Sequence, residues 1–355
     1  MMHDLSGQEI RLGIEALSRF MPMHLLLDAK DRILSVGPTL QRVLEGIPTL
    51  GARFEDLDDG NGYLFRISKD GRFILGGGGN ICAYPVNSAA AYTVSRDKAH
   101  TKRVLQSGGI PVINGGLFFA QTRRVAMRSP GREAADAVNF ASQLGYPVFC
   151  KPNLGSRGTF AEIVRNEAGL ADYISRVAVD FEAFLIEPLL GGAEHRVLVQ
   201  DGRPVFHSTK NEPTLLGDGR STLAELLGAM NQDIAADGVS ALPVSALGAD
   251  ASRVPAAGER VGLPGRRNLS AAGAIEQVSE VVPVALAALA ISAVRALGLR
   301  IGAVDMFDIS SQGDLSRLVV IEVNGNPGLR ALENTNRSDL IRSIWTSMLN
   351  ECLSS

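Results

Sequence analysis

The sequence predicts a mixed α/β (α+β) fold, because helical segments repeatedly end near glycine and lead into short apolar strands. A predicted helix over residues 132–144 ends at Gly145 and runs directly into the apolar strand 146–152. A second predicted helix, over 283–297, leads into a pair of apolar strands. Helices that alternate with strands in this way are typical of sheets covered by helices.

The composition is that of an ordinary globular protein. The chain has 355 residues, of which 45% are hydrophobic and 21% charged, and its formal net charge is -3. This length predicts two or three domain-sized units. We expect no nucleic-acid partner, because a protein that neutralises phosphate backbones carries a basic excess. The three cysteines are widely spaced and odd in number, which favours free thiols over disulfides or a zinc site.

Neither a targeting segment nor a membrane anchor is predicted. The N-terminal residues contain acids and lack an apolar core, so they do not have the pattern of a signal peptide. The apolar run 281–294 is too short to span a bilayer, and Pro283 and Gly298 frame it as a helix. We therefore expect a cytoplasmic protein with no membrane partner.

Residues 1–94 predict an N-terminal α/β domain. The apolar runs 23–27 and 33–36 flank a polar turn, which predicts a strand, a turn and a second strand. The glycines 76–79, followed by Asn80, predict a loop near a domain boundary. We interpret this domain as a lid or a dimerisation domain, with a PAS-like sensor as the weaker alternative.

Several elements are predicted beyond residue 94. A helix over 96–107, capped by Ser95, is expected to end at the next glycines and to be followed by a strand-like segment at 110–112. The remaining expectations are a hairpin of 195–200 with 204–209 around Asp201-Gly202, a loop or inserted region over 238–265, and C-terminal strands over 301–309 and 318–323.

A loop suited to phosphate groups follows the strand that ends at Lys151. Residues 153–159 (NLGSRGT) are small, rich in glycine and supplied with backbone N–H groups, which can act as fixed partial positive charges. The glycine spacing alone favours an ordinary turn, and the segment is not a Walker loop. Lys151 is well placed to hold a phosphate as a point charge, or else to extend from the strand end into solvent. Lys98 offers a second cation, unless it belongs to a solvated helix face.

Carboxylates within the two C-terminal strands predict a metal site. Asp305 lies among apolar residues in one strand, and Glu322 and Asn324 lie in the next. A carboxylate in an apolar strand is costly unless it is paired or bound to metal. Glu322 and Asn324 are two residues apart and so share one sheet face, where both could reach one hard cation. The alternative, an acid at a strand edge followed by an Asn-Gly turn, is disfavoured by the apolar flanks.

Six short motifs occur in one order between about residues 75 and 335. They are SRDKAHTK at 95–102, GIPV at 109–112, KP at 151–152, GSRG at 155–158, EPLL at 187–190, and Asp305 followed by EVN at 322–324. This series resembles the ATP-grasp superfamily. Within it, the stretches 195–199, 216–222, 258–261 and 267–273 are similar to the ATP-grasp domain of cyanophycin synthetase and of the bifunctional glutathione synthetases.

The resemblance implies an ATP-grasp fold over residues 95–355, with two α+β subdomains that clasp ATP. Their expected ranges are about 110–190 and about 191–355. It also implies an ATP-dependent ligase that joins a small-molecule acid to an amine through an acyl phosphate. The cofactors implied are ATP and Mg²⁺, with Mn²⁺ as an alternative metal. A homodimer is left open.

Carried over by position, the resemblance assigns three groups of residues. The nucleotide would be held by Lys98, Lys151, Gly155, Ser156, Gly158, Thr159, Glu187, Pro188, Leu189, Leu190 and Glu194. The catalytic groups would be Lys151, Arg157, Lys210, Arg267 and Asn268. The metal ligands would be Asp305, Glu322 and Asn324. Within these groups, residues 187–190 would meet the adenine and Glu194 the ribose hydroxyls.

The sequence also departs from these relatives. No Mur-ligase domain follows the Asn-x-x-Pro-Gly segment and no glutamate–cysteine ligase domain precedes the motifs, so we do not expect a complete cyanophycin synthetase or bifunctional protein. D-alanine:D-alanine ligases have an arginine two residues before the metal-binding aspartate, where this chain has Ala303. Two other functions stay open, a nucleotide-binding regulatory module without turnover and a small-molecule kinase.

Overall fold

The computed structural model describes residues 25–27, 33–36, 51–58, 64–77, 81–155, 158–191, 193–210, 214–236, 244–263, 277–311 and 313–353. The chain divides into two compact units. One comprises 1–85, 236–238 and 336–355, and the other 86–235 and 239–335. Helices and sheets occur in both units, which confirms the predicted mixed fold class. The expected domain boundary at residue 94 stays a prediction.

The first unit contains two small antiparallel sheets. Strands β1 (Leu25–Leu27) and β2 (Ile33–Val36) pair with each other, which confirms the two predicted strands, while the turn predicted between them lies outside the described residues. Strands β3 (Arg53–Asp56), β4 (Leu64–Lys69) and β5 (Arg72–Gly77) form a meander. Helix α10 (Ser338–Leu353) contacts β5, and Tyr84 stacks on Trp345 with ring centroids 5.5 Å apart.

The first two residues of the predicted glycine loop at 76–79 belong to a strand instead. Gly76 and Gly77 are the last residues of β5, and Gly76 lies against the ring of Phe65 on β4. A Cβ atom at Gly76 would lie 2.5 Å from that ring, so the glycine is required by close packing within a strand. Residues 78–80 of the prediction lie outside the described residues.

Two helices stand where one was predicted in the second unit. Helix α3 (Ala89–Arg96) ends before Asp97, and α4 (Lys98–Ser107) begins directly after it. The predicted cap at Ser95 is wrong, because Ser95 is a buried residue of α3 and Asp97 caps α4 by accepting a 2.9 Å bond from the His100 backbone N–H. The segment 110–112 is not a strand either, since only Val112 makes an isolated bridge, to Val320.

A four-stranded antiparallel sheet has the order β6-β9-β7-β8. Its strands are β6 (Gly116–Phe119), β7 (Val148–Pro152), β8 (Glu162–Val164) and β9 (Ala183–Pro188). Helices α5 (Ala134–Leu144) and α6 (Glu167–Asp180) pack on it through buried residues that include Ala141 and Tyr173. Helix α5 ends as predicted at Gly145, whose φ of 86° is favourable only for glycine.

A five-stranded antiparallel sheet has the order β14-β11-β10-β15-β16. Its strands are β10 (Ala193–Gln200), β11 (Arg203–Lys210), β14 (Gln277–Ser279), β15 (Ile301–Asp308) and β16 (Leu318–Asn324). The predicted hairpin is confirmed, and its turn residues Asp201 and Gly202 both have positive φ values, 49° and 73°. The C-terminal strands also occur where they were predicted.

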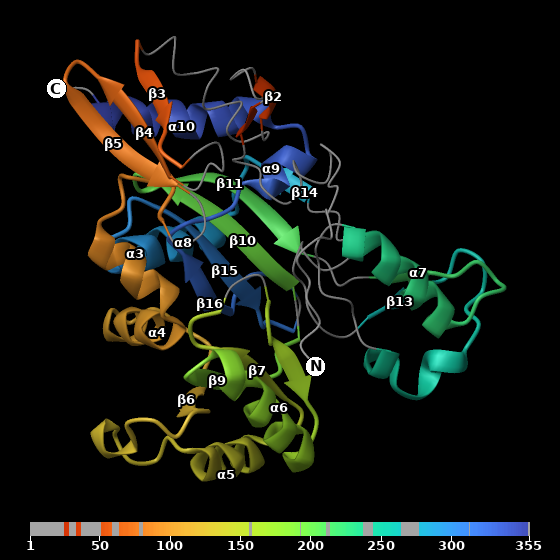
Figure 1. Cartoon of the computed structure of the whole chain (residues 1–355). Coiled ribbons are helices and arrows are strands. Elements are labelled where there is room, and N and C mark those ends of the chain that lie inside the picture. The colour runs from red at the N-terminus through yellow and green to blue at the C-terminus, as the bar shows by residue number, and fades with distance from the viewer. Residues whose placement is uncertain are drawn as a thin grey trace, which may run out of the picture. The chain divides into compact units, whose positions relative to one another are not determined.

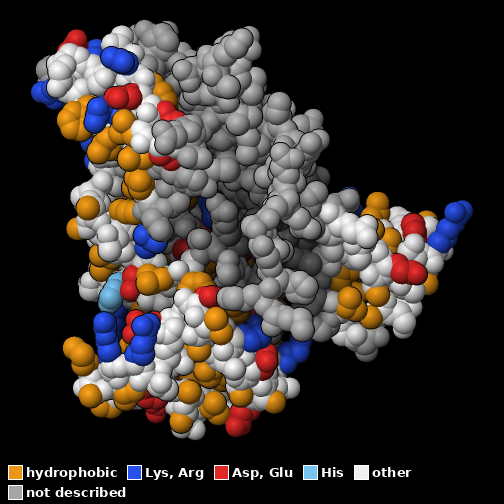
Figure 2. Space-filling model, viewed as in Figure 1, with side chains coloured by type: hydrophobic (Ala, Val, Ile, Leu, Met, Phe, Trp, Pro, Cys, Tyr) orange, Lys and Arg blue, Asp and Glu red, His pale blue; other side chains and the backbone are white. Residues whose placement is uncertain are grey.

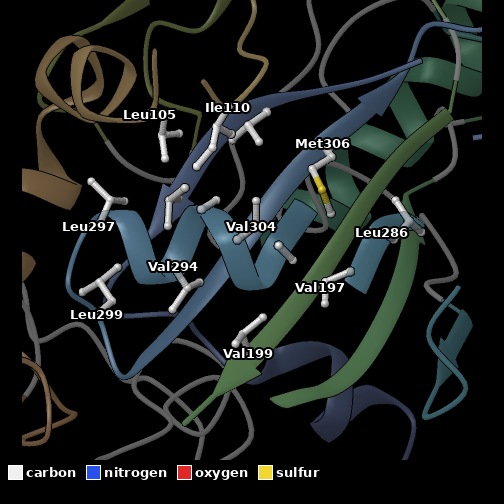
Figure 3. Packing of buried hydrophobic residues seen from close by; sticks show 14 of the residues in the cluster. Leu105, Ile110, Val197, Val199, Leu286, Val294, Leu297, Leu299, Val304 and Met306 are labelled. Atoms are coloured by element: carbon white, nitrogen blue, oxygen red, sulfur yellow. The ribbon is translucent and has the colours of Figure 1, made fainter. Parts of the chain in front are cut away.

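The two faces of this sheet differ in chemistry. Helix α8 (Val284–Ala296) lies across one face and packs Leu286, Ala290, Ala293 and Val294 against buried strand residues such as Val197 and Val304 (Figures 1 and 3). Because side chains alternate along a strand, the residues between these apolar ones point to the other face. That second face carries Glu194, Arg196, Asp305, Glu322 and Asn324.

The predicted loop or insertion over 238–265 is partly structured. Strands β12 (Thr214–Leu216) and β13 (Arg260–Gly262) pair, and helix α7 (Leu223–Ala236) and the 3₁₀ segment η3 (Val244–Ser252) lie between them in sequence. Leu215, Leu223, Leu227, Leu247 and Leu263 form a small core of their own. Hydrophobic side chains also reach the surface of this part (Figure 2). Leu216, Val244 and Val254 are about half exposed.

The remaining elements are short. A 3₁₀ turn, η2 (Val125–Met127), precedes α5, and helix α9 (Arg330–Asn334) precedes α10. Within the described ranges, none of the helices combines the length and the apolar character that crossing a membrane requires.

Candidate functional site

A buried carboxylate lies between two lysines at the centre of the candidate site. The Lys151 Nζ, on β7, is 3.0 Å from Glu187 Oε2, on β9, and the Lys102 Nζ, on α4, donates to Glu187 Oε1. The side chain of Glu187 is only 2% exposed. Each oxygen of Glu187 therefore has its own cation, and the three charges hold α4, β7 and β9 together.

These charges shift one another's pKa values. Burial by itself would raise the pKa of Glu187, but Lys151 and Lys102 outweigh it and hold this pKa below its usual range. Burial would likewise lower the pKa of Lys151, yet Glu187, Glu322 and Glu194 together raise it. The pKa of Lys102 is lowered, because burial and the repulsion from Lys151 exceed the attraction of Glu187. Lys151 is thus a firmly charged cation among three carboxylates.

Lys98 lies between the phosphate-type loop and the acidic sheet face. Its Nζ donates a 2.6 Å hydrogen bond to the Gly155 carbonyl and lies 3.6 Å from Glu322 Oε1. The loop is anchored to the start of α4 by Asn153, whose side-chain oxygen accepts a 2.9 Å bond from the Ala99 backbone N–H. The alternative of a solvated lysine is wrong, because Lys98 is only 7% exposed.

The loop after β7 turns sharply and is held at its far end. Gly158 has φ of 71°, and Phe160 has φ of 51°, a region that side chains rarely adopt. The Tyr173 hydroxyl on α6 donates a 3.0 Å bond to the Phe160 carbonyl, which stabilises this turn. Thr159 is exposed beside it, while Ser156 and Arg157 lie outside the described residues.

The segment after β9 continues from the buried Glu187 to the surface. Pro188 pairs with Val148 at the end of the sheet, and Leu189 is 43% exposed. Leu190 is half-buried, and Glu194 on β10 is buried and opposite Lys210 in register. As a nearby negative charge, Glu194 contributes to raising the pKa of Lys151. The side chain of Lys210 lies outside the described residues.

The predicted metal ligands occupy neighbouring strands. Asp305 on β15 is directly opposite Glu322 on β16, and the Asn324 Nδ2 donates a 3.2 Å bond to Asp305 Oδ2. Arg196, opposite Asp305 on β10, binds both carboxylate oxygens at 2.7 Å. Asp305 is 3% exposed in this clamp, whereas the Glu322 side chain is 31% exposed.

This set fits a hard cation in its chemistry. Two carboxylates and an amide oxygen are ligands of the kind that Mg²⁺ accepts. Among the described residues, no group of three or more His, Cys, Asp or Glu side chains could hold a metal ion, and Asn324 adds an amide oxygen beside the two carboxylates. Glu322 would face an incoming ion directly, and Arg196 would hold Asp305 in a fixed orientation.

Two residues that sequence reasoning missed are central to this geometry, Lys102 and Arg196. Lys102 lies four residues after Lys98, which places both on one face of a helix. Arg196 lies two residues after Glu194 and shares its sheet face. Spacing could have indicated both residues, but not their acidic partners.

Of the other predicted catalytic residues, Arg267 and Asn268 lie outside the described ranges. The three cysteines are free thiols.

Comparison with known proteins identifies sequence relatives for about two thirds of the chain. No family model matches the chain. A cyanophycin synthetase of Trichormus variabilis is 31% identical over 252 residues, which is 66% of this chain and 26% of that protein. The glutathione biosynthesis bifunctional protein GshAB of Enterococcus faecalis is 26% identical over 256 residues, 66% of this chain and 32% of that protein. The chain thus spans about a quarter to a third of the length of these curated relatives.

Solved structures also resemble the chain. A bifunctional glutathione synthetase from Pasteurella multocida has a TM-score of 0.46 and 20% identity, and covers 86% of this chain and 43% of its own. A D-alanine–D-alanine ligase from Bacillus anthracis has a TM-score of 0.47 and 16% identity, and covers 75% of this chain and 69% of its own.

The sequence relatives confirm the resemblance to the ATP-grasp superfamily that the motifs indicated. More particularly, they confirm the likeness to cyanophycin synthetase and to the bifunctional glutathione proteins.

Proposed function

We propose that this chain is an ATP-dependent carboxylate–amine ligase that forms an amide or peptide bond and releases ADP and phosphate. One observation carries the proposal. Lysines from α4 and β7 converge, deeply buried, on carboxylates that include Glu322, next to a glycine loop. Buried cations need anionic partners. The phosphates of a nucleotide carry the negative charge that these lysines would bind, once the phosphates have displaced some of the carboxylates from them.

The residues can be given roles from their positions. Lys98 and Lys151 would bind phosphate oxygens, and backbone N–H groups of the loop over 155–159 would cover them. Residues 187–190 would contact the base, and Glu194 would accept hydrogen bonds from the ribose. Arg157, Lys210, Arg267 and Asn268 would lie near the transferring phosphate or the acyl group.

The metal ligands would be Asp305, Glu322 and Asn324, with Mg²⁺ as the expected ion and Mn²⁺ as a substitute. When bound, the metal supplies neutralisation of charge on the phosphates. The chain's own contribution is positioning. Arg196 orients Asp305, and Lys98 places a cation beside Glu322. The loop would exclude water from an acyl phosphate that would otherwise hydrolyse.

The substrates would be a small-molecule acid and an amine of amino-acid or peptide type. The acid carboxylate would attack the γ-phosphorus, ADP would leave, and the amine would then displace phosphate from the acyl carbon. No covalent enzyme nucleophile is needed. The names of the sequence relatives support this substrate class.

Trapping with hydroxylamine tests the reaction class. The protein is incubated with ATP, MgCl₂, a panel of amino acids and dipeptides, and hydroxylamine in place of the amine. We expect a hydroxamate together with ADP and phosphate. Detection of AMP and pyrophosphate would reject the mechanism, and a stable phosphorylated alcohol would make the protein a kinase. Tight ATP binding without turnover on every acid would favour the regulatory module.

Two substitutions test the site assignments. Lys151→Ala and Glu322→Gln should each reduce ADP formation at least about a hundredfold, the scale for loss of one electrostatic contact to a transferring group. Lys151→Ala should also weaken ATP binding, whereas Glu322→Gln should raise the magnesium requirement. Arg103→Ala, at an exposed position on α4, is the control and should retain activity. Normal turnover of Glu322→Gln at low magnesium would show that the metal assignment is wrong.

A further inference from the structure

Lys102 is a buried cation to which neither the sequence motifs nor the proposed mechanism gives a role. It is 8% exposed, and its Nζ donates to Glu187 Oε1. A buried charge costs several kcal/mol of desolvation, and well-packed apolar residues often serve stability equally well. The presence of an ammonium group here therefore calls for an explanation other than stability.

The geometry links Lys102 to Lys151 through one carboxylate. Lys151 binds Glu187 Oε2 at 3.0 Å while Lys102 occupies Oε1. Because both oxygens are engaged, the plane of the carboxylate is fixed, and with it the position of the Lys151 ammonium. One negative charge is thereby shared between two cations.

Loss of Lys102 would change this balance in two ways. The Glu187 carboxylate could rotate, and its full charge would then act on Lys151 alone. Lys151 already lies among Glu187, Glu322 and Glu194, so a phosphate must compete with them for it. A stronger and less well-oriented hold by Glu187 would make that competition harder.

We propose that Lys102 is a positioning residue which, through Glu187, holds the Lys151 ammonium where a nucleotide phosphate can bind it. The two lysines of α4 then have different tasks, since Lys98 contacts the loop carbonyl of Gly155 and Lys102 contacts Glu187 one helical turn later. This inference rests on the proposed nucleotide site, but it assigns Lys102 no contact with the nucleotide itself.

A double-mutant cycle distinguishes action through Glu187 from direct contact. The full chain is titrated with ATP in the presence of MgCl₂ by calorimetry, as wild type, Lys102→Met, Lys151→Met and the double variant. Lys102→Met should weaken ATP binding about tenfold, the lower end of what loss of a supporting partner costs. In the Lys151→Met background the same change should matter less than about twofold. Lys102→Arg, which keeps a cation at Oε1, should recover most of the loss.

The matched control is Arg103→Met, which removes a charge from the neighbouring, exposed position of the same helix and should leave ATP affinity unchanged. A second cycle covers the case in which the double variant does not fold. In a Glu187→Gln background, which lacks the linking charge, Lys102→Met should again have less than about a twofold effect. Thermal unfolding of each variant verifies that it is folded.

The outcomes separate the two proposals. If the wild type binds no ATP, the proposed function fails and this inference fails with it. The second outcome is that the wild type and Lys151→Met behave as expected, but Lys102→Met weakens ATP binding by the same factor in the variant backgrounds as in the wild type. Lys102 would then contact the nucleotide directly, and the inference would be overturned. Unchanged ATP affinity in Lys102→Met would overturn it as well.

Discussion

The clamp between Arg196 and Asp305 allows a stability prediction with a control of matched geometry. Arg196 binds both oxygens of Asp305 at 2.7 Å, and the two side chains are 20% and 3% exposed. Arg176 binds both oxygens of Glu162 at 3.0 and 2.8 Å, but there the side chains are 42% and 31% exposed. Both pairs join a guanidinium to both oxygens of a carboxylate, and the Arg196 pair is the more buried one. Arg176 also binds Asp172 at 2.8 Å, so its removal breaks two exposed ion pairs.

Burial sets the magnitude of the expected effect. In Arg196→Met the Asp305 carboxylate would remain buried without its cation, and breaking a buried pair in this way costs about 3–5 kcal/mol. The Asn324 amide still donates to Asp305, so we expect about 3 kcal/mol. In Arg176→Met, water can solvate both Glu162 and Asp172, and the expected loss is below about 1 kcal/mol.

Urea denaturation followed by circular dichroism measures both losses. The comparison uses changes in midpoint, because a chain of two units need not unfold in a single step. Addition of MgCl₂ should recover part of the stability of Arg196→Met, since a bound cation would neutralise Asp305. Equal losses in the two variants would refute the reasoning from burial. No response to magnesium in Arg196→Met would count against Asp305 as a metal ligand.

Three further predictions concern the second unit. Asn87→Asp should lower the free energy of unfolding by about 2–4 kcal/mol, because the Asn87 amide donates to two carbonyls, at 2.9 and 2.8 Å, which would then face a carboxylate. A thermal midpoint within about 1 °C of wild type would contradict this. The pKa of His207 is lowered to about 4 by burial and by His195, so below about pH 6.5 the unfolded chain takes up a proton that the folded site rejects. The free energy of unfolding of the wild type should therefore fall by about 1 kcal/mol from pH 7.5 to 5.0, a value already reduced because the ring is only half-buried. The fall should be clearly smaller in His207→Gln. Parallel pH profiles of the two proteins would exclude His207 as the cause. Leu105→Ala should cost about 2–5 kcal/mol in urea denaturation, because Leu105 is fully buried in the core cluster to which α8 also contributes (Figure 3). A loss below about 1 kcal/mol would show that the surrounding side chains close the cavity.

Local sequence patterns determined many elements but not all of their limits. The strands 301–308 and 318–324, the helix that ends at Gly145 and the turn at Asp201-Gly202 follow from apolar runs and turn chemistry, and these predictions are confirmed. The helix predicted at 96–107 was too long at its start, because both Ser95 and Asp97 are good caps and only the packing of α3 selects Asp97. The structured part of the predicted insertion was missed because its small core forms from residues far apart in sequence.

For the site, the sequence by itself determined which chemical groups are present and which of them share a face. Two features of the site are local and can be recognised from periodicity along the sequence. One is the presence of cations near a glycine loop, and the other is the spacing of two residues between Glu322 and Asn324. Only the tertiary structure decided the partners. Glu187 lies 85 residues from Lys102, and Asp305 lies 109 residues from Arg196, yet each pair makes direct hydrogen bonds. Such pairing depends on strand register and on burial, which strengthens the interaction between charges, and neither can be read from spacing along one chain segment.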